Sequence, residues 1–396
     1  MVELTTSELF DSDTLLALSR RTAAAGVLSV YVEADAGADP GLQGAAIDIK
    51  NRLAQLERNI AAEGPPERTR ALREGIDRLA PELERLTSPQ EQGRGRALFA
   101  PLGEEQEVVR FSSQMPLTNR VVLDASPFIH PLLELLDEGR PAGVLLVSQD
   151  EARLLEWRLG ELRPLERIEP EVVEAPHERS GPVGSSPSSR PGTPKREQRQ
   201  ARERDQTRRF LARVEADASR LAAENGWERV LVSGGERLTE PLAAALTRPA
   251  GVAVIRDARV LVRLDQASLS ATVTERLHAQ HDEYERRLVR DAREAALGSG
   301  TGAVGLSEVV GALNEGRVAH LVYDPEIRYQ GSIGTDGRLH ADDEPGAAEI
   351  EVVAEPRLTE RLVERALETG ARVTPVEGAA AGALAEAAGI AALLRW

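Results

Sequence analysis

The chain has 396 residues, enough for two or three domains of ordinary size, and a formal net charge of −16. A hydrophobic content of 41% excludes a largely disordered chain, and the lack of cysteine excludes disulfides, thiolate metal sites and cysteine nucleophiles. The acidic first residues, and the lack of an apolar run near the roughly 18–20 residues of a membrane span, predict a cytoplasmic protein without membrane contact.

The first section, residues 1–138, predicts an α/β domain. A strand pattern at 26–34 precedes two polar-periodic helices within 45–86, which the segment from Glu63 to Glu67 separates. Three short strand patterns with turn residues between them follow at 96–102, 107–113 and 120–126.

The second section, residues 141–248, predicts another α/β domain. Three strand-like runs within 143–168 are punctuated at Gln149-Asp150 and at Leu159-Gly160, as in a β-meander. A later helix carries an apolar stripe, and a strand pattern at 229–235 and a helix pattern at 238–247 follow it. The stripe consists of Phe210, Leu211, Val214, Ala218 and Leu221.

The third section, residues 250–396, alternates helices and strands. It opens at 251–260 and runs into a long charged helix over about 265–297. Helix patterns follow at 306–316 and 358–370, strand patterns at 319–324 and 371–377, and an apolar end at 382–396. Alternation at this short spacing favours a parallel, sandwiched α/β layout.

One insert differs from the rest of this acidic chain. From Ser180 the sequence is rich in Ser, Gly and Pro, and it then becomes rich in arginine. Residues 179–209 hold nine basic and three acidic residues, a net charge of +6. Between Lys195 and Arg209 the one apolar residue is Ala201, so this helix entry has no face to bury. It is either a solvated helix with Glu/Arg pairs or a projecting basic helix that contacts RNA phosphates.

Three further patterns do not predict chemistry. The segment GTGAVG, with Gly300, Gly302 and Gly305, matches a dinucleotide fingerprint but follows a helix, so it is interpreted as a helix cap and loop. His278 and His281 have no evident third metal ligand and are interpreted as exposed helix histidines. His177 has no partner motif that would make it a general base.

Several segments resemble the archaeo-eukaryotic class 1 release factor and Pelota superfamily, in its bacterial branch. They are LTERLVERALETGARVTPVEGAAAGALAEAAGIAALLRW at the end, GLSEVVGALNEGRVAHLVYD before it, and in the middle the meander, loop, basic helix and RVLVSGG. In this order they cover residues 141–396.

The resemblance implies three domains: a divergent N-terminal α/β domain over 1–138, an RNase H-like domain over 141–248, and an α/β/α sandwich over 250–396. The third is of the type that binds kinked RNA. The flexible loop 174–194 would take the place of the family's Gly-Gly-Gln tip and point at the peptidyl-transferase centre. The implied tip residues are Gly181, Gly184, Ser185 and Ser186, and the implied RNA-binding residues are Arg179, Arg190, Lys195, Arg196, Arg199 and Arg202.

The loop contains no glutamine, and the chain contains no Gly-Gly-Gln. Bacterial relatives without that motif resemble ribosome-hibernation factors of the Balon kind, which predicts a non-catalytic, monomeric protein in the vacant A site. Its implied partners are ribosomal RNA and a translational GTPase, without DNA, cofactor, metal or catalytic residues. The alternatives are a peptidyl-tRNA hydrolase with a different tip and a metabolic enzyme on an α/β scaffold.

Overall fold

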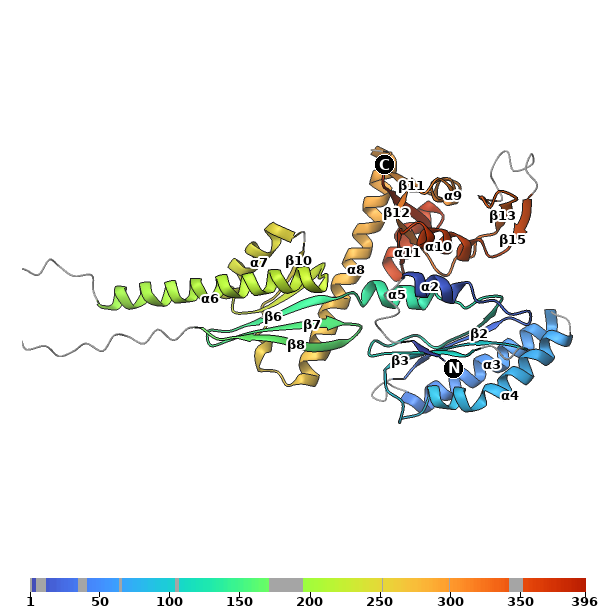
Figure 1. The fold of residues 1–396 in the computed structure, drawn as a ribbon, viewed down its shortest axis with the longest axis horizontal. Coiled ribbons are helices and arrows are strands. Elements are labelled where there is room, and N and C mark those ends of the chain that lie inside the picture. The colour runs from blue at the N-terminus through green and yellow to red at the C-terminus, as the bar shows by residue number, and fades with distance from the viewer. Residues whose placement is uncertain are drawn as a thin grey trace, which may run out of the picture. The chain divides into compact units, whose positions relative to one another are not determined.

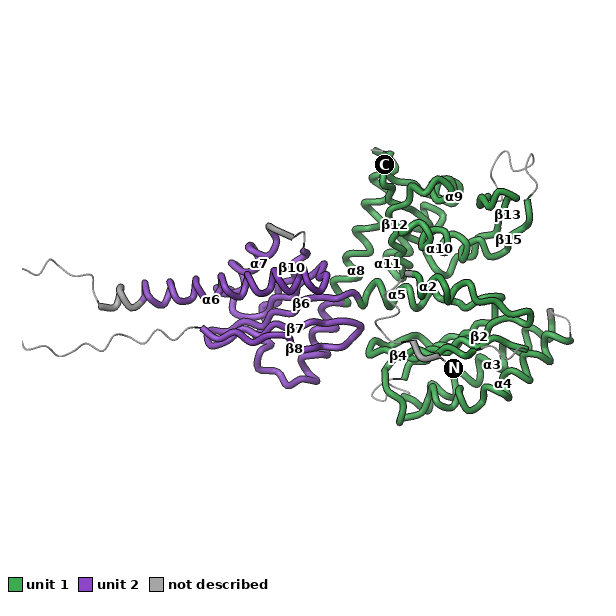
Figure 2. Tube along the Cα trace, in the orientation of Figure 1, with its two compact units in different colours: residues 1–139, 278–396 green, residues 140–277 purple. Residues whose placement is uncertain are grey.

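The computed structural model of this chain describes residues 2–4, 12–34, 41–63, 66–103, 107–170, 195–250, 252–298, 300–341 and 352–396. These residues form a mixed α/β fold with four sheets, which confirms the predicted fold class (Figure 1). They divide into two compact units, one of residues 1–139 with 278–396 and one of residues 140–277 (Figure 2). The sequence boundary at 248–250 falls inside the second unit, and the division into three domains stays a prediction.

The N-terminal part of the first unit is a five-stranded sheet in the order β1-β4-β3-β2-β5. β1 runs parallel to β4 and the other neighbours are antiparallel. The predicted strands and the pair of helices are confirmed, although the first of these helices begins four residues earlier than expected, at Gly41. The elements are β1 (Val2–Leu4), α2 (Ser12–Ser19), β2 (Val27–Glu33), α3 (Gly41–Glu63), α4 (Pro66–Leu86), β3 (Gly95–Pro101), β4 (Val109–Ser113), β5 (Arg120–Asp124) and α5 (His130–Glu138).

A buried arginine secures the turn from α4 into β3. Arg96 is 5% exposed, and its guanidinium donates to carbonyl oxygens that follow the last turn of α4. Nη1 lies 2.8 Å from the oxygens of both Leu86 and Ser88, and the other nitrogens reach the oxygens of Glu91, Gln92 and Gly93. One buried side chain thus donates to five carbonyl oxygens of this turn and fixes its path.

The C-terminal part of the first unit has a sheet in the order β11-β17-β12-β16 and a small sheet β14-β13-β15. The expected parallel layout is wrong except for β12 and β16, because β17 runs antiparallel to both of its neighbours. The chain enters β17 through Ala388 and Gly389, whose positive φ angles of 53° and 77° make a tight turn. The elements are α8 (Gln266–Gly298), β11 (Gly302–Val304), α9 (Leu306–Asn314), β12 (Val318–Tyr323), β13 (Gly331–Gly334), β14 (Leu339–Ala341), β15 (Val352–Glu355), α10 (Leu358–Glu368), β16 (Arg372–Pro375), α11 (Gly378–Leu384) and β17 (Ile390–Leu394).

The second unit has one five-stranded sheet in the order β10-β9-β6-β7-β8. β6, β9 and β10 are parallel, and β6, β7 and β8 form the predicted antiparallel meander. β7 turns into β8 at Leu159 and Gly160, both with positive φ, as a two-residue hairpin requires. The elements are β6 (Ala142–Val147), β7 (Ala152–Arg158), β8 (Glu161–Ile168), α6 (Lys195–Asn225), β9 (Arg229–Gly234), α7 (Glu236–Ala250), β10 (Ala253–Asp257) and the first part of α8.

Helices cover both faces of this sheet. On one face α6 and α7 share a core with β6, β7 and β9, and the predicted apolar stripe of α6 is confirmed as part of that core. On the other face Trp157 is fully buried, and its indole Nε1 donates to the Thr274 hydroxyl of α8 at 3.0 Å. The sheet therefore holds α6 in a fixed orientation within this unit.

Candidate nucleic-acid interface

Helix α6 has two halves with different surroundings. From Phe210 to its end, an apolar residue is buried at each turn, and Phe210, Val214 and Ala218 are between 0% and 6% exposed. From residue 200 to 209 no side chain is buried. Figure 1 shows this first half running past the ends of β7 and β8. The prediction of a helix entry without a buried face is confirmed for these residues.

The exposed half is basic and only partly neutralised within the helix. Asp205 forms ion pairs with Arg208 and with Arg209, the latter at 2.8 Å. Arg202 and Arg204 are exposed and form no ion pair with a described residue. The solvated-helix interpretation therefore accounts for Arg208 and Arg209, while two guanidinium groups nearby keep an uncompensated charge.

The predicted site residues fall into three groups. Arg202 is described in full and is exposed at the surface of α6. Three predicted RNA-binding residues lie in the first turns of α6, where the structure describes only the helical backbone: Lys195, Arg196 and Arg199. The loop 174–194 and the rest of the predicted set lie outside the described residues: His177, Arg179, Gly181, Gly184, Ser185, Ser186 and Arg190.

The segment GTGAVG has a structural role. Gly302 opens β11, and a Cβ atom at this position would lie 2.4 Å from the backbone nitrogen of Ala296 in α8. Gly305 precedes α9, and the side chain of Glu308 in the first turn accepts a hydrogen bond from the Val304 backbone N–H at 3.1 Å. The segment therefore packs a strand against α8 and begins a helix; the loop interpretation missed β11.

One of the two histidines of α8 differs from the sequence interpretation. His278 is exposed, and its Nδ1 lies 2.7 Å from Glu138 of α5. His281 is 6% exposed, so the prediction that it is an exposed histidine is wrong. It stacks on Tyr284, and its Nε2 lies 3.3 Å from Oε1 of Glu285 one turn later. This face of α8 is covered because it continues into the apolar core around Val289 and Ala292.

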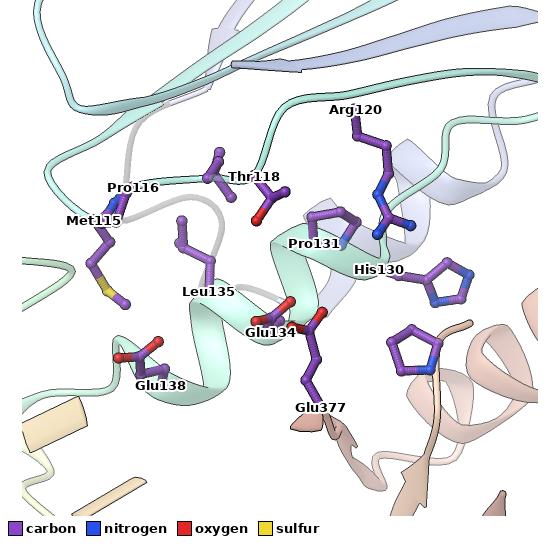
Figure 3. A pocket seen from close by; sticks show the side chains of 12 residues that line it. Met115, Pro116, Thr118, Arg120, His130, Pro131, Glu134, Leu135, Glu138 and Glu377 are labelled. Atoms are coloured by element: carbon purple, nitrogen blue, oxygen red, sulfur yellow. The ribbon is translucent and has the colours of Figure 1, made fainter. Parts of the chain in front are cut away.

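An acidic pocket in the first unit has no counterpart in the sequence analysis. It offers about 70 Å³ of free space between the segment before β5, helix α5, and residues Pro325 and Glu377. Figure 3 shows the carboxyl groups of Glu134 and Glu377 pointing toward one another, with Glu138 one turn farther along α5. Glu377 comes from a segment far from α5 in the chain, and no spacing in the sequence connects it to Glu134.

The surroundings of Glu134 in this pocket favour its protonated form. Burial raises the pKa of Glu134 to about 8, and the neighbouring charges of Glu377, Glu138 and Glu285 and a hydrogen bond with Glu377 act in the same direction. Glu134 and Glu377 can therefore share a proton. Among the described residues no group of three or more His, Asp or Glu side chains is suited to hold a metal ion.

Two separate groups of buried hydrogen bonds join α5 to the C-terminal sheet. His130 Nδ1 lies 2.5 Å from the hydroxyl of Tyr323, and the Thr374 hydroxyl donates to Asp137 at 2.7 Å. His320 Nε2 lies 2.8 Å from the same Thr374 hydroxyl. Helix α5 is thus joined to β12 and β16 by hydrogen bonds as well as by apolar packing.

Comparison with known proteins supports the sequence resemblance. Residues 127–282 match the model of bacterial archaeo-eukaryotic release factor family 10, and this match encloses the whole unit of residues 140–277. The chain is also 22% identical over 220 residues to uncharacterized protein YocB of Bacillus subtilis (strain 168), which covers 54% of this chain and 80% of that protein. None of the described helices has the length and hydropathy of a membrane-spanning segment.

Three solved structures are similar at low identity. The archaeal Pelota of a ribosome-bound Pelota and ABCE1 model is 14% identical, covers 76% of this chain and 77% of its own, and gives a TM-score of 0.38. Saccharomyces cerevisiae Dom34, described as a translation termination-like factor that interacts with Hbs1, is 10% identical with coverages of 76% and 80% and a TM-score of 0.39. The archaeal termination factor aRF1 is 18% identical with coverages of 100% and 99% and a TM-score of 0.27.

Proposed function

We propose that this protein, whose residues 127–282 match the model of bacterial archaeo-eukaryotic release factor family 10, is a ribosome-binding factor that occupies the vacant A site. In this proposal it acts in the cytoplasm as a hibernation factor, with the loop 174–194 directed at the peptidyl-transferase centre. A translational GTPase would be a further partner.

The single observation that supports this proposal is the division of α6. Its second half is packed onto a sheet, so its first half is held at a fixed angle to that unit, and the first half keeps exposed, uncompensated arginines. An acidic protein with a net charge of −16 is repelled by RNA at long range, so a local basic projection is what an RNA contact requires.

We further propose that the protein does not hydrolyse peptidyl-tRNA. Peptide release needs a water placed against the ester carbonyl and donors aimed at the developing oxyanion. The segment from Ser180 to Pro194 contains four prolines and no glutamine, so the sequence provides no evident group for either task. The second candidate function, a hydrolase that uses a different tip, depends on His177 or on the serines of this loop.

The proposed partner is tested by the position of the protein in a sucrose gradient. In lysates of starved and of growing cells, the chain should sediment with ribosomes in at least one of the two conditions. A position only in the top fractions under both conditions would exclude the ribosomal function.

Replacing Lys195, Arg196, Arg199 and Arg202 together by Gln should weaken binding to vacant ribosomes without unfolding the protein. The sequence of this stretch offers no apolar face to bury, and each lost phosphate contact should reduce the slope of log K against log salt by roughly 0.7–0.9. Circular dichroism checks that the variant keeps its fold, and filter binding at several salt concentrations gives the slope of log K against log salt. An unchanged affinity and slope would assign these residues to a solvated helix.

The absence of hydrolysis is tested on stalled ribosome complexes that carry a labelled nascent peptide. The purified protein should bind vacant ribosomes and release no peptide above the rate without factor. Release by the wild type that disappears when His177, Ser185 or Ser186 is changed to Ala would exclude the non-catalytic function and support the hydrolase.

A further inference from the structure

Three arginines of α6 lie along one side of the helix. Arg202, Arg209 and Arg213 are seven and four residues apart, and these spacings return to the same side of an α-helix. With a rise of about 1.5 Å per residue, they are separated by about 10.5 Å and about 6 Å along the axis. Arg204 lies about 160° and Arg208 about 120° around the helix from Arg202, outside this line.

This line of arginines remains exposed where the helix begins to pack on the sheet. Arg202, Arg209 and Arg213 are all exposed, although Phe210 and Val214 next to two of them are buried in the core. One further spacing of seven leads to Arg220, whose guanidinium contacts Glu166 of β8 at 2.5 Å. The line therefore runs along the side of α6 that faces β8, the edge strand of this sheet.

The described residues cancel the charge on this line only in part. Arg202 and Arg213 form no ion pair with a described residue, and Arg209 shares Asp205 with Arg208. From residue 200 to 213 the exposed side chains are charged or polar apart from two alanines. A protein partner needs large apolar or aromatic anchors at the centre of its interface, and this surface offers none. Several guanidinium groups along one side of a helix suit a polyanion with a repeated charge.

We infer that Arg202, Arg209 and Arg213 form one phosphate-binding line, along which the backbone of an RNA strand lies on the β8 side of α6. This inference rests on the proposed function, and it adds two residues, Arg209 and Arg213, and an orientation to it. The bound RNA would extend from the projecting half of the helix onto the half that is packed on the sheet. Arginine forks bind phosphate oxygens without reading base identity, so the contact would be independent of sequence.

Two double variants of α6 test this inference because they are matched. Arg202→Gln with Arg209→Gln and Arg204→Gln with Arg208→Gln each remove one exposed arginine without an ion pair and one partner of Asp205. The first should weaken binding to vacant ribosomes about tenfold or more and lower the salt slope by roughly 0.7–0.9 per lost contact. The second should weaken binding less than about threefold, an effect of overall charge alone. Circular dichroism should show the same helix content in both.

The single variant Arg213→Gln tests the part of the line that lies on the packed half of α6. It should weaken ribosome binding by several-fold with a lower salt slope, as one lost phosphate contact predicts. If the two double variants lose ribosome affinity equally, or if neither loses any, the inference of one phosphate-binding line is overturned. Unchanged ribosome binding by Arg213→Gln would show that the phosphate-binding line does not extend over the packed half of α6.

A 12-residue fluorescent oligouridylate separates this inference from the proposed function. If the wild type does not bind ribosomes, the proposed function fails. The inference is still supported in that case if the oligouridylate binds the first double variant more weakly than the second. If the two double variants differ in their affinity for ribosomes but bind the oligouridylate equally, the arginines contact ribosomal protein instead of RNA. The inference is then overturned. A wild type that binds neither probe also overturns it.

Discussion

Replacing Gly143 with alanine should destabilise the unit of residues 140–277 by about 3 kcal/mol, at the upper end of the usual cost of overpacking. Gly143 lies in β6, where it is paired with β7 on one side and β9 on the other. A Cβ atom at this position would lie 2.3 Å and 2.5 Å from two ring carbons of Trp227, which is 4% exposed. The indole is rigid and buried, and β6 cannot shift without losing hydrogen bonds to both neighbours.

Chemical denaturation followed by tryptophan fluorescence measures this effect, because Trp157 and Trp227 are both buried in this unit while Trp396 is 66% exposed. The matched control is Gly235→Ala, since a Cβ atom there meets nothing within 4 Å and φ is not positive. Gly143→Ala should move the fluorescence midpoint to lower denaturant, and Gly235→Ala should leave it within experimental error. A midpoint shared by Gly143→Ala and wild type would show that Trp227 can move aside. Because this unit carries α6, ribosome binding should be lost in parallel with the fluorescence change.

Replacing Glu134 with glutamine should stabilise the unit of residues 1–139 and 278–396 at pH 8 and leave its stability nearly unchanged at pH 5. The folded state raises the pKa of this carboxyl to about 8, so between its usual range and pH 8 the folded protein holds a proton that the unfolded chain has lost. In wild type this group therefore reduces stability as the pH rises through that window. Glutamine stays neutral and keeps a hydrogen-bonding group next to Glu377. The expected gain at pH 8 is on the order of 3 kcal/mol.

Calorimetry between pH 5 and pH 8.5 tests this expectation, with the transition of the other unit identified by its tryptophan fluorescence. Glu74→Gln is the control, because Glu74 is exposed on α4 in the same unit. The control should follow the pH dependence of wild type, and Glu134→Gln should flatten it. A slope in Glu134→Gln equal to that of wild type would mean that the carboxyl is ionised across this range and that water reaches it in the folded state.

The patterns that the sequence predicted correctly are those that depend on near neighbours in the chain. The meander of 143–168, the helix pair separated at Glu63 to Glu67, and the apolar stripe from Phe210 to Leu221 follow from local periodicity and turn residues, which one segment carries without help from another. The exposed basic entry of α6 belongs to the same class, because a stretch without apolar residues has nothing to bury in any fold.

Only the packing of distant segments decided the remaining features. The burial of His281 against the core of the C-terminal part and the antiparallel direction of β17 each depend on elements tens of residues away. The acidic pocket is the clearest case, because Glu134 and Glu377 lie more than two hundred residues apart and the pKa of Glu134 is raised only where the fold brings the two carboxyl groups together. Desolvation and Coulomb interactions act through space, so they leave no periodicity in the sequence from which such a site could be predicted.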